Sequence, residues 1–164
     1  MIRTDEDAAQ RGKFLLTAAV IAAAITAGYM AYERVVAEWM PGADAGNAAQ
    51  VARGRQVYLS FCAECHGTRL EGQPDWQALL PEGGRKAPPQ DETGHTWHHP
   101  DRVLFDITKL GGQPFSPAGY KNNMPGYAER LSDADIWAAI AYIKSRWSED
   151  IQEKQAQINK RASK

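Results

Sequence analysis

Residues 62–66 read Cys62-Ala63-Glu64-Cys65-His66, and the chain has no cysteines other than Cys62 and Cys65. Two cysteines separated by two residues share one helical turn, so both thiols can reach the vinyl groups of one porphyrin and form thioethers. The next side chain, that of His66, then points at the iron. The stretch therefore predicts one haem c, attached covalently through Cys62 and Cys65, with His66 as an iron ligand.

Two other interpretations of the cysteine pair were weighed, a zinc site and a redox-active dithiol. A structural zinc site needs two further ligands, and His95 and His98 lie about thirty residues further on, without the spacing of a zinc finger. A dithiol of the thioredoxin type belongs in a βαβ setting, whereas the flanks of this motif have a helical pattern. The motif favours haem over both.

Length and composition limit the remaining possibilities. A chain of 164 residues has room for one domain of about 100 residues with appendages. The sequence is 43% hydrophobic and 24% charged, with a formal net charge of -1. These values exclude a strongly basic nucleic-acid binder and a disordered chain. One haem domain is the simplest prediction.

An uncharged stretch at residues 14–32, FLLTAAVIAAAITAGYMAY, lies near the N-terminus. As a helix it would span about 28 Å, close to the hydrocarbon thickness of a bilayer. A cleaved signal peptide is the alternative, although the apolar stretch is long for a signal core. Because Arg3, Arg11 and Lys13 precede the stretch and only Arg34 follows it closely, we expect a cytoplasmic N-terminus and a periplasmic haem domain at the inner membrane.

The stretch after the apolar segment predicts how the chain is divided. Pro41 and Gly42 should end the membrane helix, and Tyr29, Tyr32 and Trp39 should anchor it at the membrane surfaces. We expect five parts: a cytoplasmic N-terminus (1–13), a transmembrane helix (14–32), a juxtamembrane helix end with a short linker (33–47), the haem domain (48–147) and a charged C-terminal extension (148–164).

The first half of the domain has a helical pattern followed by a loop. Apolar residues in residues 48–61 predict a helix that leads into the haem motif. Residues 67–100 are rich in glycine and proline, so we expect a loop with at most short helical turns near residues 75–80. A loop of this length in a compact domain needs a cofactor to order it.

The second half should contain two further helices. Pro100 suits the first turn of a helix over residues 101–110, which Gly111 and Gly112 should stop. Its expected apolar face consists of Val103, Leu104, Ile107 and Leu110. Ser132, with Asp135 three positions later, should cap the last domain helix. The polar residues 148–164 could continue as a charged helix or fray.

These pieces in this order resemble a class I c-type cytochrome, in particular the membrane-anchored, single-haem members of proteobacterial type. The resemblance covers about residues 48–147. It implies a mostly α fold, in which one N-terminal transmembrane helix precedes a cytochrome c domain of about four helices wrapped around one covalent haem. It also implies that Gly54 and Tyr58 of the first domain helix pack against the last one near Tyr142.

The resemblance implies a second axial ligand as well. In this family the ligand is a methionine shortly before the last helix, and Met124 stands eight residues before Ser132, in the turn Met124-Pro125-Gly126. Asparagines before this turn make it a loop rather than an apolar helix face, which favours a ligand over core packing. The alternatives for the same position are His95, His98 and His99, which could also hold a second metal such as copper.

Two further residues of the haem site follow from the family. The carbonyl of a loop proline, Pro88 or Pro89, usually accepts the hydrogen bond of the histidine ligand, here His66 Nδ1–H. Trp97 should donate its indole N–H to a haem propionate.

The expected function is that of a membrane-tethered one-electron carrier rather than an enzyme. By resemblance, its donor would be a quinol-oxidising cytochrome complex and its acceptor a haem-copper oxidase or a photosynthetic reaction centre. The main alternative is a fixed cytochrome c subunit of a respiratory supercomplex or oxidase. A haem-based sensor or a peroxidase-like enzyme is a further alternative.

Overall fold

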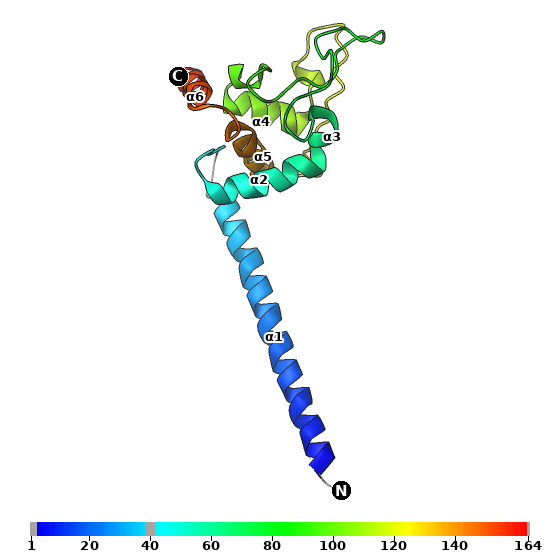
Figure 1. Ribbon diagram of the computed structural model, residues 1–164, viewed down its shortest axis with the longest axis vertical. Helices are drawn as coiled ribbons and strands as arrows, with labels where there is room; N and C mark the ends of the chain where they lie inside the picture. The colour runs from blue at the N-terminus through cyan, green and yellow to red at the C-terminus, as the bar shows by residue number, and fades with distance from the viewer. Residues whose placement is uncertain (1–2, 39–41, 164) are drawn as a thin grey trace. The chain divides into compact units, whose positions relative to one another are not determined.

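The computed structural model describes residues 3–38 and 42–163. The chain divides into two compact units, residues 1–40 and residues 41–164. The described residues form six α-helices, two short 3-10 helices and no β-strand, which confirms the mostly α fold. The helices are α1 (Arg3–Glu38), α2 (Ala48–Phe61), α3 (Ala63–His66), η1 (Thr96–His98), α4 (Asp101–Leu110), η2 (Gln113–Phe115), α5 (Asp133–Lys144) and α6 (Glu149–Ala162) (Figure 1).

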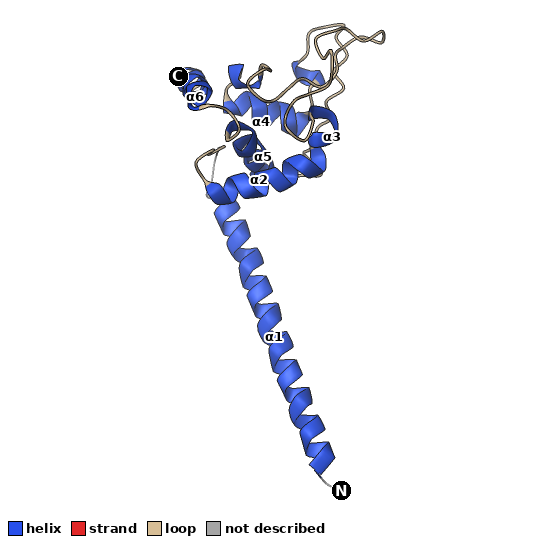
Figure 2. Cartoon of the chain, in the orientation of Figure 1, coloured by secondary structure: helices blue, strands red, loops and turns tan. Residues whose placement is uncertain are grey.

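The described residues of the unit 41–164 contain five α-helices. Four of them, α2 to α5, lie within residues 48–147, where about four were expected, and α6 lies in the C-terminal extension. The single turn α3 is separate from α2, and α6 forms after α5. The loop fits the expectation of at most short helical turns near residues 75–80, since residues 74–77 form turns without a helix, and the 3-10 turn η1 lies later in the loop. Figure 2 shows the long loops that join the helices.

The first unit is the single helix α1. Within it, Gly12–Tyr32 has a mean hydropathy of 1.9, and none of this segment is buried against the rest of the chain. Thr17 and Thr26 turn their hydroxyls back onto helix carbonyls, so these polar groups need no water. The segment is long and apolar enough to cross a membrane. A signal sequence would meet the same criteria, so the anchor remains a prediction.

Two expectations for the end of this helix lie outside the described residues. They are the anchoring role of Trp39 and the stop at Pro41. The helix continues to Glu38, and beyond the gap the expected linker is folded onto the domain. Gln50 accepts from the Asp44 N–H at 2.8 Å and donates to the Gly42 carbonyl at 2.9 Å. Residues 42–47 are therefore not a free tether.

The domain is built on a close crossing of α2 and α5. A Cβ at Gly54 would lie 1.8 Å from the backbone oxygen of Ala138 and 3.0 Å from Cβ of Tyr142, so only glycine fits there. One turn later, the rings of Tyr58 and Tyr142 have centroids 5.4 Å apart. The expected packing of Gly54 and Tyr58 near Tyr142 is confirmed.

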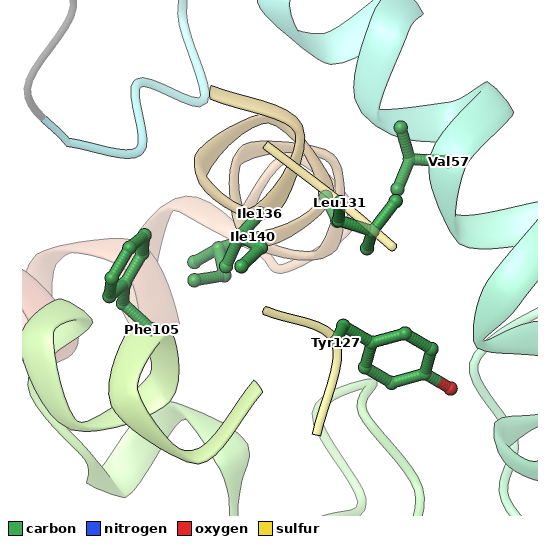
Figure 3. Close-up of a cluster of buried hydrophobic side chains, with 7 residues drawn as sticks. Val57, Phe105, Tyr127, Leu131, Ile136 and Ile140 are labelled. Atoms are coloured by element: carbon green, nitrogen blue, oxygen red, sulfur yellow. The ribbon is translucent and has the colours of Figure 1, made fainter. Parts of the chain in front are cut away.

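Helix α5 supplies seven of the fifteen buried apolar residues that the structure describes, more than any other helix. The predicted cap is confirmed, because the Ser132 and Asp135 side chains form a reciprocal capping box at its start. Ile136 and Ile140 of α5 face Phe105 of α4, with Val57, Tyr127 and Leu131 completing the cluster (Figure 3).

The buried face of α4 differs from our expectation. Phe105, which we did not place on it, is the buried residue of this helix and stacks on Trp137 at 4.3 Å between centroids. Leu110, which we did place there, is 56% exposed. The spacing of the apolar residues alone could not show which face of α4 is buried, because apolar residues occur on both faces of this helix.

We predict that Gly54→Ala destabilises the domain. In an exposed helix this change is favourable, since glycine costs up to about 1 kcal/mol relative to alanine. Here the new methyl group would collide with the backbone of Ala138, and overpacking of this kind costs about 1–3 kcal/mol. Chemical denaturation of the haem-loaded protein measures the change. Ser60→Ala, an exposed position of α2, is the control and should have almost no effect.

Candidate functional site: the haem attachment turn

Cys62 stands at the junction of two helices. It ends α2, where its N–H donates to the Tyr58 carbonyl at 2.9 Å. Its own carbonyl accepts from the N–H groups of Cys65 and His66, which closes the single turn α3. The two cysteines and His66 therefore lie on one helical turn, as the motif predicted, and Gly67 ends that turn with a φ of 81°.

Two tyrosine hydroxyls hold the ends of this turn. The hydroxyl of Tyr127 donates to the Phe61 carbonyl at 2.7 Å, directly before Cys62. The hydroxyl of Tyr58 donates to the Gly67 carbonyl at 2.8 Å, on the other side of the turn. Burial raises the pKa of both tyrosines above the ordinary value, so both hydroxyls keep the proton that they donate.

His66 is buried and its orientation is set by the loop that follows. Its Nδ1 lies 2.8 Å from the Pro88 carbonyl oxygen. A carbonyl can only accept, so Nδ1 carries the proton and Nε2 keeps its lone pair. Burial lowers the pKa of His66, and the hydrogen bond to Pro88 opposes this shift without cancelling it. A neutral imidazole with one nitrogen fixed by a carbonyl is the usual form of a metal-ligating histidine.

The backbone around Pro88 is packed without space for movement. A Cβ at Gly72 would lie 2.6 Å from the carbonyl carbon of Pro88, and a Cβ at Gly94 would lie 2.0 Å from the Pro89 oxygen. Glycines on both sides thus let the chain close around the two prolines. Of the two prolines considered, Pro88 is the one that meets His66, and Pro89 faces Gly94.

The Cys62 thiol lacks the lowered pKa that is typical of a redox-active cysteine. Cys62 and Cys65 are both free in the structure. Burial, with a smaller contribution from Cys65, raises the pKa of the Cys62 thiol to about 11. Catalytic cysteines of Cys-x-x-Cys proteins have lowered pKa values instead. Thioether formation needs only that both sulfurs lie on one turn beside the histidine.

The backbone of Met124 is fixed on both sides within its loop. Its N–H donates to the Asn122 side chain at 3.0 Å, and its carbonyl accepts from the Gly112 N–H at 3.0 Å. Asn122 is held in turn by Ser116, because its Nδ2 donates to the hydroxyl at 3.0 Å. The side chain of Met124 is half-buried. This loop and the loop of Pro88 meet where Gly84 packs directly on the Lys121 carbonyl.

Apolar side chains around these two loops suit an apolar cofactor. The exposed large apolar residues of the domain include Leu79 on the Pro88 loop, Leu110 at the end of α4 and Phe115 on the Met124 loop. Exposure of the apolar surface of leucine and phenylalanine to water is unfavourable by about 25 cal/mol per Å² of that surface. A porphyrin is a large apolar group. These side chains, the two thiols and the oriented His66 fit a covalent haem.

The histidine-rich part of the loop makes contacts within the protein. The indole N–H of Trp97 donates to the Glu92 carbonyl at 3.3 Å, so its role as a propionate donor remains a prediction. The His95 ring stacks on Trp76 and contacts the His99 ring edge-on. Burial and the neighbouring histidines lower the pKa of His95. The described residues contain no group of three His, Cys, Asp or Glu side chains that could hold a second metal ion.

The sequence profile of the cytochrome c family matches residues 51–147, which is more than half of the chain. The chain belongs to the cytochrome c family. Proteins of this family bind haem c covalently, and Cys62 and Cys65 have the spacing for it. No curated protein and no solved structure gives a significant match to the chain.

The structure adds residues to this cytochrome c site that the sequence did not indicate. Tyr127 acts through a long-range hydrogen bond to the Phe61 carbonyl. Asn122 acts through a local hydrogen bond, which its side chain accepts from the Met124 N–H. Arg130 lies over the rings of Phe61 and Tyr127, at 5.1 and 5.6 Å from their centroids. An asparagine two residues before a methionine in a loop is a usable signal for such a turn. The tyrosine–carbonyl contact has no sequence signal.

We predict that Tyr127→Phe loosens the attachment turn. The ring stays in the core, but the Phe61 carbonyl loses its donor, which costs about 1 kcal/mol. Chemical denaturation of the haem-loaded cytochrome should show this loss. Tyr120→Phe, a half-buried tyrosine of the Met124 loop, is the matched control. Equal stability of both variants would show that the Tyr127 hydroxyl does not hold the turn.

Proposed function

We propose that this cytochrome c is a membrane-tethered one-electron carrier whose iron is ligated by His66 and Met124. The observation that carries the proposal is the hydrogen bond between His66 Nδ1 and the Pro88 carbonyl. It leaves Nε2 free for iron and fixes the ring plane before any ligand binds. The haem supplies the one-electron couple.

The loop geometry supports Met124 as the sixth ligand. Hydrogen bonds on both sides hold its backbone in place, which a ligand needs and a gap-filling core methionine does not. His98 is exposed, and the His95 ring stacks on Trp76 and contacts the His99 ring. A thioether favours ferrous iron and so gives a relatively high potential. Two protein ligands also leave no open position for oxygen or peroxide, which argues against an enzyme or a sensor.

The tether follows from α1 and from the folded linker. The segment Gly12–Tyr32 is apolar and unburied, and the preceding basic residues favour a cytoplasmic N-terminus. Between Glu38 and Gly42 the chain has only four residue steps, which reach about 15 Å at most. The haem domain would therefore work close to the periplasmic face of the inner membrane.

We propose membrane complexes as redox partners, with a quinol-oxidising cytochrome complex as donor and a haem-copper oxidase or photosynthetic reaction centre as acceptor. A carrier of this kind exchanges electrons in brief contacts of small area. The formal charge of -1 gives no strong steering toward a basic or an acidic partner.

A fixed subunit of a respiratory supercomplex or oxidase is the second candidate. The short tether favours it, because a domain that is pinned close to the membrane serves one neighbour better than several. The small residues Ala18, Ala22, Ala24 and Gly28 would also allow α1 to pack closely against another helix. A free carrier and a fixed subunit differ in whether α1 itself is part of the assembly.

We predict that Met124→Ala removes the sulfur-to-iron charge-transfer band of the oxidised protein and lowers its reduction potential. The reason is that a weaker stabiliser of ferrous iron replaces the thioether. Absorption spectroscopy and an equilibrium redox titration measure both effects. Met30→Ala, within the apolar segment of α1, should leave the band and the potential unchanged. A band that persists without Met124 would exclude it as the ligand.

A separate prediction concerns the tether. A soluble form that begins at Gly42 keeps the hydrogen bonds of the linker to Gln50 and Lys144, so it should fold and take up haem. It should nonetheless deliver electrons poorly at low concentration, because a short tether provides an effective concentration of about millimolar. Added in excess to membranes that lack the anchored form, it should restore oxygen consumption or reaction-centre reduction gradually with dose.

Two outcomes of this titration separate the candidates. Full activity at stoichiometric amounts of soluble domain would show that the tether is dispensable, against our proposal. No recovery at any dose would support the fixed subunit, in which α1 belongs to the assembly. Native size analysis after mild detergent extraction provides an independent check, because a fixed subunit stays with its complex and a free carrier does not.

A further inference from the structure

The loop at residues 67–100 presents the Pro88 carbonyl to His66, and it contains little regular secondary structure. The described loop contains one isolated bridge, between Leu79 and Arg85, and the 3-10 turn η1. Its shape depends on hydrogen bonds within the loop, such as that of the Gln73 N–H to the Ala87 carbonyl at 3.0 Å, and on contacts with other parts of the chain. Several of these contacts come from the segment that follows α5, and most of that segment lies beyond the residues that the family profile matches.

The first of these contacts is made by Trp147. Its side chain is 3% exposed, and its indole N–H donates to the Gln90 carbonyl at 2.9 Å. Gln90 is two residues after Pro88. The N–H of the next residue, Ser148, donates to the Glu92 carboxylate in the same loop. An indole N–H is a donor only, and here its acceptor is the loop backbone itself.

The second contact is made by α6 at the end of the loop. Gln155 is 1% exposed, and its amide donates to the His99 carbonyl at 3.2 Å and to the Asp101 carboxylate at 2.6 Å. Asn159 donates to the Gln155 amide oxygen and accepts from the Asp101 N–H at 2.7 Å. Pro100 has no side-chain acceptor at the start of α4, so Asn159 of another helix provides the missing cap.

The packing around Pro88 transmits these contacts to His66. Gly72 and Gly94 close directly on the Pro88–Pro89 backbone, without room for a Cβ. The Gln90 N–H also donates to the Leu70 carbonyl at 2.8 Å. A displacement of the Gln90 carbonyl cannot be absorbed within so tight a turn, and it therefore changes the position of the Pro88 carbonyl.

We propose that Trp147 and Gln155 are positioning residues for the iron ligand. They clamp the two ends of the segment between Gln90 and Asp101, so that the Pro88 carbonyl stays within hydrogen-bond distance of His66 Nδ1. This hydrogen bond strengthens the imidazole as a donor to iron, so the clamp sets the reduction potential from outside the haem site. The proposal rests on the proposed function only in taking His66 as an iron ligand.

The test uses the full-length, haem-loaded protein and two pairs of variants. Trp147→Phe keeps an aromatic ring but removes the indole donor, and Trp137→Phe, whose ring stacks on Phe105, is its control. Gln155→Met keeps the length of the side chain but removes the amide, and Gln157→Met, an exposed position of the same helix, is its control. Each protein is titrated for its reduction potential. The solvent exchange of the His66 Nδ1 proton is measured by NMR in the reduced state.

We expect the potential to rise in Trp147→Phe and in Gln155→Met, because a weaker Nδ1 hydrogen bond makes His66 a poorer donor to ferric iron. Exchange of the Nδ1 proton should become several-fold faster in both. Both controls should keep the values of the unaltered protein. The sulfur-to-iron band should persist in all four variants, since the Met124 loop is not part of the clamp.

A purely structural role would give a different result. If both variants unfold more easily while potential and Nδ1 exchange stay unchanged, the clamp does not act on His66 and the proposal is wrong. If Trp147→Phe fails to retain haem, the result for Gln155→Met alone decides whether the proposal holds, because Gln155 lies eight residues beyond the family-matched region. If the spectrum of the unaltered protein shows no histidine–iron ligation, the proposed function itself is wrong. Such a spectrum differs from that of a protein in which only the clamp is weakened, because His66 stays bound to iron in the latter.

Discussion

The close crossing of α2 and α5 at Gly54 is the constraint on which the other parts of the domain depend. Both helices lead toward segments that position His66. Helix α2 runs into the attachment turn at Cys62, and α5 runs into Trp147, which holds the Pro88 loop. Because Gly54 lets the two backbones approach to contact distance, His66 and the residue proposed to clamp the Pro88 loop are positioned from one pair of helices.

Local signals in the sequence were sufficient for the attachment turn and for most helix bounds. The motif at residues 62–66 indicated haem, residues 48–61 formed a helix as predicted, and Ser132 capped α5. The tyrosine contact to Phe61 and the docking of α6 could not be predicted, because both join residues more than fifty positions apart and neither leaves a local pattern. The choice between Pro88 and Pro89 likewise depends on backbone packing against Gly72 and Gly94.

The wrong face predicted for α4 has a related cause. Periodicity marks which residues are apolar, but not which neighbour covers them. Phe105 is covered by Trp137 of α5, whereas Leu110 stands beside Gly111, which packs on the Met124 turn. In a cytochrome c, apolar side chains serve two partners, the protein core and the haem, and a hydrophobic pattern does not distinguish between them.

Lys144 connects the linker to the same network. Its ammonium donates to the Ala43 carbonyl at 3.0 Å and to the Asp101 carboxylate at 2.6 Å, and Asp101 is the residue that Gln155 and Asn159 also bind. The side chain of Lys144 is only 11% exposed, so leaving its charge without these acceptors would be costly. The ion pair of Lys144 with Asp101 thus joins the linker, α4, α5 and α6. These long-range contacts add to the local hydrogen bonds that hold the loop around Pro88, such as that of the Gln90 N–H to the Leu70 carbonyl.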